Sequence, residues 1–216
     1  MGIMDKLNSY SQYKDSDVFR PGAFNPGLFK TNKKQVKKLR PDMYSLTNLL
    51  LGGNANNPGF IQTQMNDGDM GPAIVVSKNP LLVACYSWDM DAVVFQCYPD
   101  ELGEYYGWNV GTKLITVMTY NGMGAIKKNK DLTLGQRCNN RYKSVGPIIA
   151  DLFTDNKERL ERKKSEISTE WWDYTEKLAK EYMVEYPNMA RNGLGFSFKD
   201  AQDISKIKFN RRIKLD

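Results

Sequence analysis

Four short apolar runs between Pro72 and Tyr120 constrain the fold of this chain more than any other feature. They read AIVVS, LLVACYSW, AVVFQCYP and KLITVMTY, and each ends at residues that favour turns. Runs of this length, rich in β-branched and aromatic residues, are typical of strands in a compact antiparallel sheet. The pattern therefore predicts an α+β fold, with a central antiparallel sheet of about four to six strands over residues 72–128.

The run from Leu81 to Trp88 is apolar on both faces. Alternation puts Leu81, Val83 and Cys85 on one face and Leu82, Ala84 and Tyr86 on the other. Such a strand is expected at the centre of the sheet, covered on both sides. The turn to the next run is expected at residues 89 and 90. That register pairs Cys85 with Val94 and leaves Cys85 and Cys97 as separate buried thiols.

Helices are expected on either side of these strands. Thr31 or Asn32 is expected to cap a basic helical turn, KKQVKKLR. Pro41 then starts a second helix, which ends before the glycine pair at residues 52 and 53. A polar loop, GGNANNPGF, leads from there toward the sheet.

Residues 156–186 are expected to form one long helix that ends at Pro187. Apolar residues recur at helical spacing: Leu160, Ile167, Trp171, Tyr174, Leu178 and Tyr182. The first half of this helix, KERLERKKSE, is almost entirely charged. We expect that half to project into solvent or toward a partner, and the second half to pack on the core.

The end of the chain, KIKFNRRIKLD, alternates apolar and basic residues. This alternation predicts an edge strand with a basic outer face. The expected elements divide the chain into an irregular N-terminal arm over residues 1–30 and an α+β core over residues 31–154. A long helix and a C-terminal strand over residues 155–216 are expected to pack on that core.

The composition excludes several kinds of catalytic site. The chain has no histidine, so it has no Ser-His or Cys-His nucleophile pair and no histidine metal ligand. No glycine-rich run has the spacing of a phosphate loop, and we expect no bound cofactor. No apolar run is long enough to cross a bilayer, and the first residues lack an apolar signal core. We therefore expect a cytoplasmic protein that does not bind membranes.

Carboxylates are the remaining catalytic chemistry. Asp67 and Asp69 fall in one expected turn, and Asp89 and Asp91 in another. If the two turns share one end of the sheet, their oxygens can hold Mg²⁺ or Ca²⁺. A metal-dependent phosphodiesterase or nuclease is therefore one alternative function. The competing interpretation is that aspartate is simply a good turn residue.

Basic segments give a second alternative, a nucleic-acid-binding module. The lysines of KKQVKKLR, the C-terminal strand and a basic segment after the sheet are the candidates for neutralising phosphates. The residues of that segment are Lys127, Lys128, Lys130, Arg137, Arg141 and Lys143. Ordinary solvated surface explains the same charges, and the net charge is only +6.

The interpretation favoured by the sequence is a non-enzymatic interaction or structural component of a larger assembly, such as a virion or phage-tail protein. Spaced aromatic residues occur in an N-terminal segment whose regular structure is interrupted by prolines and glycines. Such a segment is typical of an arm that becomes ordered on a neighbouring protein. The expected contact residues are Phe24, Phe29, Trp171 and Trp172. The expected partners are other proteins or further copies of this chain.

Overall fold

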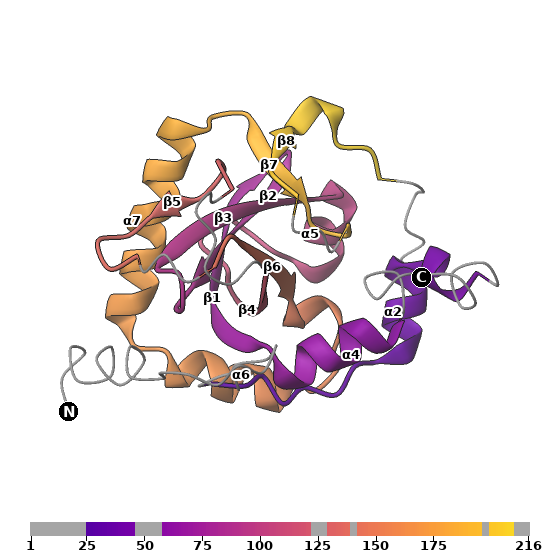
Figure 1. Ribbon diagram of the computed structural model, residues 1–216. Helices are drawn as coiled ribbons and strands as arrows, with labels where there is room; N and C mark the ends of the chain where they lie inside the picture. Colours follow the sequence, from indigo (N-terminus) through magenta and orange to yellow (C-terminus); the bar gives the residue numbers. More distant parts are fainter. Residues whose placement is uncertain (1–24, 46–57, 122–128, 139–141, 196–198, 210–216) are drawn as a thin grey trace.

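The computed structural model describes residues 25–45, 58–121, 129–138, 142–195 and 199–209 (Figure 1). Within them, eight strands form one curled sheet. They are β1 (Asp69–Lys78), β2 (Leu81–Ser87), β3 (Ala92–Tyr98), β4 (Lys113–Asn121), β5 (Thr133–Leu134), β6 (Ser144–Ile149), β7 (Met189–Asn192) and β8 (Gln202–Asp203). The order is β6-β4-β1-β2-β3-β7-β8, and β5 also pairs with β3. All pairings are antiparallel except β3 with β7.

Helices pack on this sheet, so the predicted α+β class is confirmed. They are α2 (Lys33–Leu39), α4 (Pro58–Asp67), α5 (Asp100–Tyr106), α6 (Lys157–Glu166) and α7 (Thr169–Glu185). Short 3-10 turns are η1 (Pro41–Tyr44), η3 (Ala150–Leu152) and η4 (Ile204–Lys206). In Figure 1, α7 lies on one side of the sheet, and α2, α4 and α6 lie on the opposite side and below.

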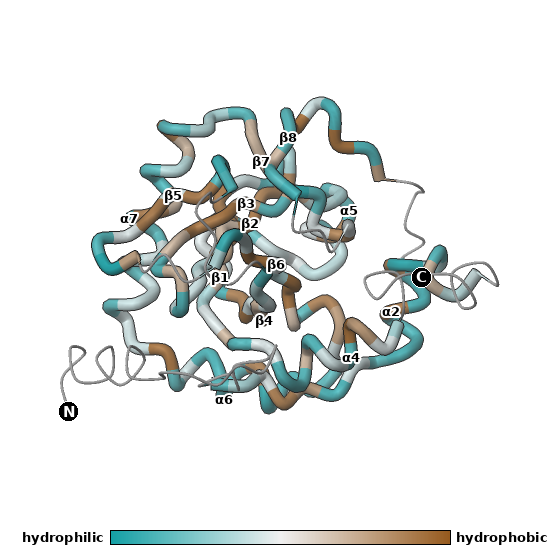
Figure 2. The backbone as a smooth tube through the Cα atoms, in the orientation of Figure 1, coloured by the Kyte–Doolittle hydropathy of each residue, from teal (hydrophilic) through white to brown (hydrophobic). Residues whose placement is uncertain are grey.

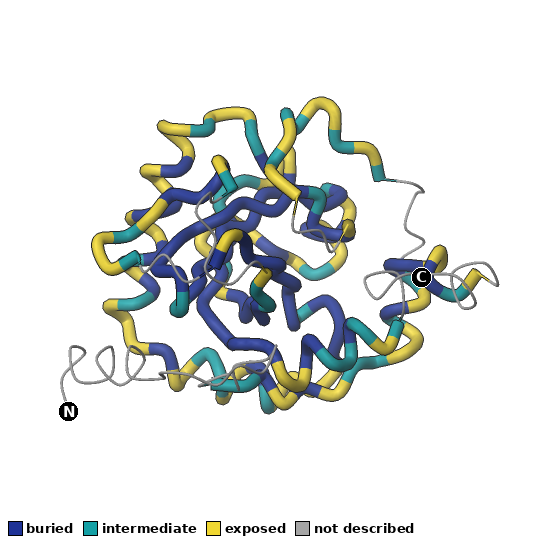
Figure 3. The backbone as a smooth tube through the Cα atoms, viewed as in Figure 1, coloured by how far each residue is buried: buried dark blue, intermediate teal, exposed yellow. Residues whose placement is uncertain are grey.

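The central position predicted for β2 is confirmed. Every residue of β2 and β3 is buried, as the dark blue strands of Figure 3 show. The two faces of β2 enter two separate apolar clusters: Leu81, Val83 and Cys85 lie in one, and Leu82, Ala84 and Tyr86 lie in the other, against α7. The hairpin register also agrees with the prediction, because Cys85 pairs with Val94. Cys85 and Cys97 remain separate thiols.

The sheet curls so that β3 and β7 approach β6, the first strand in the sheet order. Gln96 on β3 donates a hydrogen bond from Nε2 to the carbonyl of Pro147 on β6, at 2.7 Å. Arg191 on β7 donates from Nη1 to the carbonyl of Val145 on β6, at 2.6 Å. Neither contact is part of the backbone ladder. Side chains therefore satisfy backbone carbonyls of β6, which forms one end of the sheet order.

The single long helix predicted over residues 156–186 is wrong. The chain leaves the helical conformation at Ile167 (φ −87°, ψ 118°), and α7 begins after Ser168. Ile167 is buried, and its carbonyl accepts a hydrogen bond from Trp172 Nε1 at 3.2 Å. The break lets α6 and α7 follow different parts of the curled sheet. A continuous helix would place both halves on one straight axis, and the curled sheet has no straight surface of that length.

The charged helix α6 also does not project from the molecule. Figure 2 shows how hydrophilic it is compared with the central strands. Yet Leu160 is buried, and Lys164 forms an ion pair with Asp151 at 2.9 Å. Burial raises the pKa of the Asp151 carboxyl, although Lys164 acts in the opposite direction. The charges of α6 therefore hold it against the core.

The predicted C-terminal edge strand is wrong over its described part. Residues Ile204–Lys206 form a 3-10 turn, and residues 207–209 are not in a strand. The alternation reflects packing instead, because Ile207 and Phe209 contact the α7 side of the core while Lys206 and Lys208 are exposed. Residues 210–216 lie outside the described part of the chain.

Several elements were not expected from the sequence, among them α4, α5, β5, β6, β7 and β8. Helix α4 begins within the expected polar loop and ends at the expected turn of Asp67, and β6 begins directly after the basic segment, which ends at Lys143. Strand β7 extends the sheet beside β3. Most of the helix expected after Pro41 lies outside the described residues, and its described start, Pro41–Tyr44, is the 3-10 turn η1.

Candidate functional site

The four candidate metal-binding aspartates have different environments. Asp67 is exposed at the end of α4, and Asp69 is buried at the start of β1, where its Oδ1 accepts a hydrogen bond from Asn25 N at 3.5 Å. Asp69 and Asp89 both act on the buried Tyr120 hydroxyl, whose pKa is raised first by burial and then by these two acids. Among the described residues, no three or more Asp, Glu, Cys or His side chains are grouped so that they could hold a metal ion. The nuclease hypothesis therefore gains no geometric support.

Asp91 instead organises a buried polar cluster. Its Oδ1 accepts a hydrogen bond from Tyr86 OH at 2.7 Å, and its Oδ2 accepts from Arg137 N at 2.7 Å and Tyr174 OH at 3.3 Å. Burial, and then the Asp91 carboxylate, raise the pKa of Tyr86 far above its usual value, so Tyr86 stays a donor. The cluster joins the β2–β3 hairpin to the segment around residue 137 and to α7. We interpret it as structural.

The aromatic contact residues expected from the sequence lie inside the protein where they are described. Phe29 has no exposed surface, and Trp172 is 4% exposed. Trp171 is partly buried, with its ring centroid 4.2 Å from that of Trp88. Phe24 lies outside the described residues. The described end of the expected arm is also docked, because the backbone N–H of Phe29 donates to the Met65 carbonyl at 3.0 Å.

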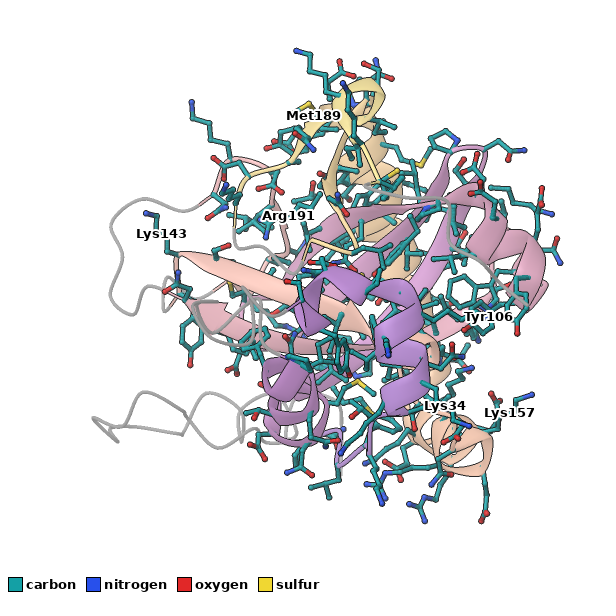
Figure 4. All side chains as sticks on the ribbon, turned by 90° about the vertical axis from the view of Figure 1, so that its right-hand side faces the viewer. Lys34, Tyr106, Lys143, Lys157, Met189 and Arg191 are labelled. Atoms are coloured by element: carbon teal, nitrogen blue, oxygen red, sulfur yellow. The ribbon has the colours of Figure 1, made fainter. Side chains whose placement is uncertain are left out.

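Three members of the basic segment after the sheet are described, and all three are exposed: Lys130, Arg137 and Lys143. Lys127, Lys128 and Arg141 lie outside the described residues. Figure 4 places Lys143 on the opposite side of the molecule from Lys34. The basic segment and the lysines of α2 are thus separate surfaces.

An open pocket of about 490 Å³ lies where the start of α2 meets the start of α6. Its lining residues come from two distant segments: Lys30, Thr31, Asn32, Lys33, Lys34, Thr154, Asp155 and Asn156. The segments are joined by hydrogen bonds from Asn32 N to the Phe153 carbonyl at 2.7 Å and from Asn32 Nδ2 to Asp155 Oδ2 at 3.2 Å. The pocket is therefore formed by tertiary contacts.

The lining of this pocket carries more positive than negative charge. Three lysines contribute ammonium groups, and Asp155 is the one acid in the lining. The capping side chains are neutral: Asn32 Oδ1 accepts from Lys34 N at 2.9 Å, and Asn156 Oδ1 accepts from Arg159 N at 3.0 Å. Directly after the lining residues in sequence, the exposed side chains of Lys157 and Glu158 carry opposite charges. A concave surface with this charge balance attracts anions.

The basic surface continues along α2 to an exposed aromatic ring on α5. Lys38 lies one turn after Lys34, and its Nζ is 5.6 Å from the centroid of the Tyr105 ring. Tyr105 is 49% exposed. The neighbouring Tyr106 OH accepts a hydrogen bond from Gln35 Nε2 at 2.9 Å, which fixes α2 against α5. Figure 4 shows Lys34, Lys157 and Tyr106 on the same side of the molecule.

The sequence signals only half of this site. The run KKQVKKLR marks the lysines of α2 as phosphate-binding candidates. Nothing in the sequence indicates that residues 154–156, more than a hundred positions later, form the other wall of a pocket. Tyr105 follows acidic residues in the sequence and gains its lysine neighbour only through folding.

Comparisons with family models, curated proteins and solved structures found no match to this chain. In the part of the chain that the structure describes, no helix is both long and apolar enough to span a membrane.

Proposed function

We propose that this protein binds nucleic acid, and that the pocket between α2 and α6 receives backbone phosphate. The observation that carries the proposal is the convergence of Lys30, Lys33 and Lys34 on a concave surface with one acid, Asp155. Lysine ammonium groups neutralise phosphates without needing a particular base sequence. Binding is therefore expected to depend steeply on salt and little on sequence.

The first test removes two pocket charges. The double variant Lys30→Gln/Lys34→Gln is expected to bind a single-stranded oligonucleotide about tenfold more weakly at low salt. Because each lysine that contacts a phosphate of a single strand adds about 0.7 to the slope of log K against log salt, that slope is expected to flatten by about 1.4. Fluorescence anisotropy over a salt series measures both quantities.

Two lysines provide matched controls. Lys180 lies on α7, across the molecule from α2 (Figure 1), and Lys180→Gln removes the same charge far from the pocket. Lys143→Gln tests the other basic surface. Neither is expected to change the salt slope. A loss of binding with Lys143→Gln but not with the pocket variant contradicts the proposal and moves the site to the segment around residues 127–143.

A second variant is expected to strengthen binding instead of weakening it. Asp155→Asn keeps an oxygen that accepts from Asn32 Nδ2 and removes the negative charge from the pocket lining. If phosphate enters this pocket, Asp155→Asn is expected to strengthen binding about threefold, because a like charge next to the anion is lost. Unchanged or weaker binding, in a variant with unaltered thermal unfolding, argues against phosphate in the pocket.

A second candidate function is a structural component of a larger assembly, with a virion or phage-tail protein as one form. Exposed apolar side chains on α7 and β5 favour it: Val184 is 84% exposed, Met183 45% and Leu134 44%. Helix α7 packs beside β5, where Thr133 Oγ1 donates to Glu185 Oε2 at 3.3 Å. This proposal requires a protein partner or a further copy of the chain to cover these side chains.

Sedimentation of the purified protein tests this second candidate. If further copies bind through this surface, the wild type is expected to associate at micromolar concentration, and Met183→Glu/Val184→Glu to remain monomeric. Both side chains face solvent, so the free energy of unfolding of the variant is expected to lie within about 0.5 kcal/mol of the wild-type value. A wild type that stays monomeric at every concentration, and that elutes alone when purified from its source cells, rules out this function.

A further inference from the structure

The proposed nucleic-acid site extends beyond phosphate contacts, and its aromatic end indicates which form of nucleic acid it takes. Tyr105 is half-exposed at the end of the lysine row of α2, next to Lys38. We propose that the ligand is a single strand whose backbone passes from the pocket along Lys34 and Lys38 and whose base stacks on the Tyr105 ring. This inference rests on the proposed function and specifies its ligand.

The geometry of α2 supports a continuous track. Lys34 lines the pocket, and Lys38 follows four residues later on the same helix face, about 6 Å further along the axis. Lys38 Nζ then lies over the Tyr105 ring, 5.6 Å from its centroid, so a base that stacks on that face displaces the flexible lysine side chain toward the phosphate. Positive charge and an aromatic surface are thus adjacent, in the combination that single-strand-binding proteins use.

Neighbouring aromatic rings hold the half-exposed Tyr105 ring in position. Its ring packs edge to face with Tyr106 at 5.0 Å between centroids, and Tyr106 stacks on Trp108 at 5.2 Å. Trp108 is buried in the main apolar cluster. Since the ring has a rigid support, a base that stacks on it loses little energy to reorganisation. In a duplex the bases already stack on each other, so only unpaired bases gain from this ring.

Acids on α5 set a limit to the track. Glu101 lies one turn before Tyr105 on the same helix face and is exposed. Its charge repels a phosphate that follows the base past Tyr105. The contact surface therefore ends at this ring, and Glu101→Gln is expected to strengthen single-strand binding about twofold.

The test compares three ligands: a single-stranded oligothymidylate, a duplex of the same length, and inorganic polyphosphate, which carries charge without bases. The wild type is expected to bind the single strand about tenfold more tightly than the duplex at equal salt. Tyr105→Ala is expected to lose about tenfold in affinity for the oligothymidylate and none for polyphosphate. Tyr105→Trp is expected to restore the affinity, because a larger ring stacks at least as well.

The outcomes separate this inference from the proposed function. If the wild type binds neither polyphosphate nor oligonucleotide, the phosphate pocket itself is wrong. If both bind with a steep salt slope but Tyr105→Ala changes nothing, or weakens polyphosphate equally, the single-strand inference is overturned while the pocket stands. Equal affinity for single strand and duplex overturns it as well. Thermal unfolding of each variant confirms that the comparison is between folded proteins.

Discussion

Replacing Arg191 with methionine is expected to lower the free energy of unfolding by about 3–5 kcal/mol, one of the two largest stability losses we predict for a single substitution. Arg191 is 4% exposed and Asp131 is 3% exposed, and they form a two-pronged ion pair, with Nε–Oδ2 at 2.6 Å and Nη2–Oδ1 at 2.9 Å. The substitution leaves the Asp131 charge buried without its counter-ion. It also removes the donor to the Val145 carbonyl.

The size of this loss follows from where the ion pair lies in the sheet. Arg191 is on β7 and Val145 on β6, so the guanidinium joins two strands that are far apart in the order of the curled sheet. Methionine fills a similar volume but offers no hydrogen bond to either partner. For a domain of this size, the loss corresponds to about 10 °C in the midpoint of thermal unfolding. Urea unfolding followed by tryptophan fluorescence measures the free energy directly.

Two controls separate the buried charge from the loss of any ion pair. Glu176 and Lys180 form an exposed pair on α7 at 2.8 Å, and Glu176→Gln is expected to cost less than about 0.5 kcal/mol. The double variant Arg191→Met/Asp131→Leu removes both charges and is expected to recover about half of the loss. If Arg191→Met loses as little free energy of unfolding as Glu176→Gln, a buried unpaired charge is not what destabilises the variant. The same conclusion follows if the double variant loses as much as the Arg191→Met and Asp131→Leu single variants added together.

The sequence was sufficient where the information is local and periodic. Strand β2 is recognisable because both of its faces are apolar, and its two faces do enter two different apolar clusters. The β2–β3 register follows from one turn, and Cys85 does pair with Val94. Asn32 caps α2 as one of the two predicted residues. In each case a short stretch of sequence contains both the signal and its physical cause.

The sequence was insufficient where a distant contact decides the conformation. The apolar stripe of α6 and α7 reads as one helix, because nothing nearby shows that Ile167 turns into the core. Phe29 looks like an anchor for a partner, yet the chain's own core buries it. Arg191 and Asp131 are sixty positions apart, and each looks like an ordinary surface charge in the sequence. The α2–α6 pocket has the same origin, so half of its lining carries no sequence signal.

Replacing Asp91 with alanine is the second large effect, and we expect it to cost about 3 kcal/mol of unfolding free energy. The carboxylate accepts three hydrogen bonds, from Tyr86 OH, Tyr174 OH and Arg137 N. Tyr86 is 1% exposed, so its hydroxyl cannot turn to water when the acceptor is removed. Hydrogen bonds to a buried charged group contribute about 1.5–3 kcal/mol each, and their losses are not additive within one cluster.

The backbone at Asp91 adds a smaller contribution. Its φ is +45°, in the left-handed region that aspartate tolerates better than alanine. Asp91→Gly removes the side chain and relieves this strain, so it is expected to be about 1 kcal/mol less destabilising than Asp91→Ala. If the two variants are equally unstable, the backbone contributes nothing. If Asp91→Gly matches the wild type, the hydrogen bonds contribute nothing.

A local readout distinguishes undocking of the segment around residue 137 from general destabilisation. Asp91 holds the backbone N–H of Arg137, and Cys138 follows it with its side chain partly exposed. Burial raises the pKa of the Cys85 and Cys97 thiols to about 12, so both are protonated at pH 8 as well as inaccessible. Cys138 is therefore expected to be the first thiol to react with an alkylating reagent, and trypsin to cleave after Arg137 before other described sites in the core.

The rates of Cys138 alkylation and of cleavage after Arg137 are both expected to rise at least tenfold in Asp91→Ala, under conditions where the variant remains folded. In the wild type, local opening of this segment must break the hydrogen bond from Arg137 N to the Asp91 carboxylate, and in the variant that bond is absent. Arg191→Met serves as the comparison, since it is destabilised by a similar amount but keeps the Asp91 cluster intact. If Arg191→Met accelerates Cys138 alkylation and cleavage at Arg137 as much as Asp91→Ala does, then global unfolding controls access to this segment. In that case Asp91 has no special role in holding it against the β2–β3 hairpin.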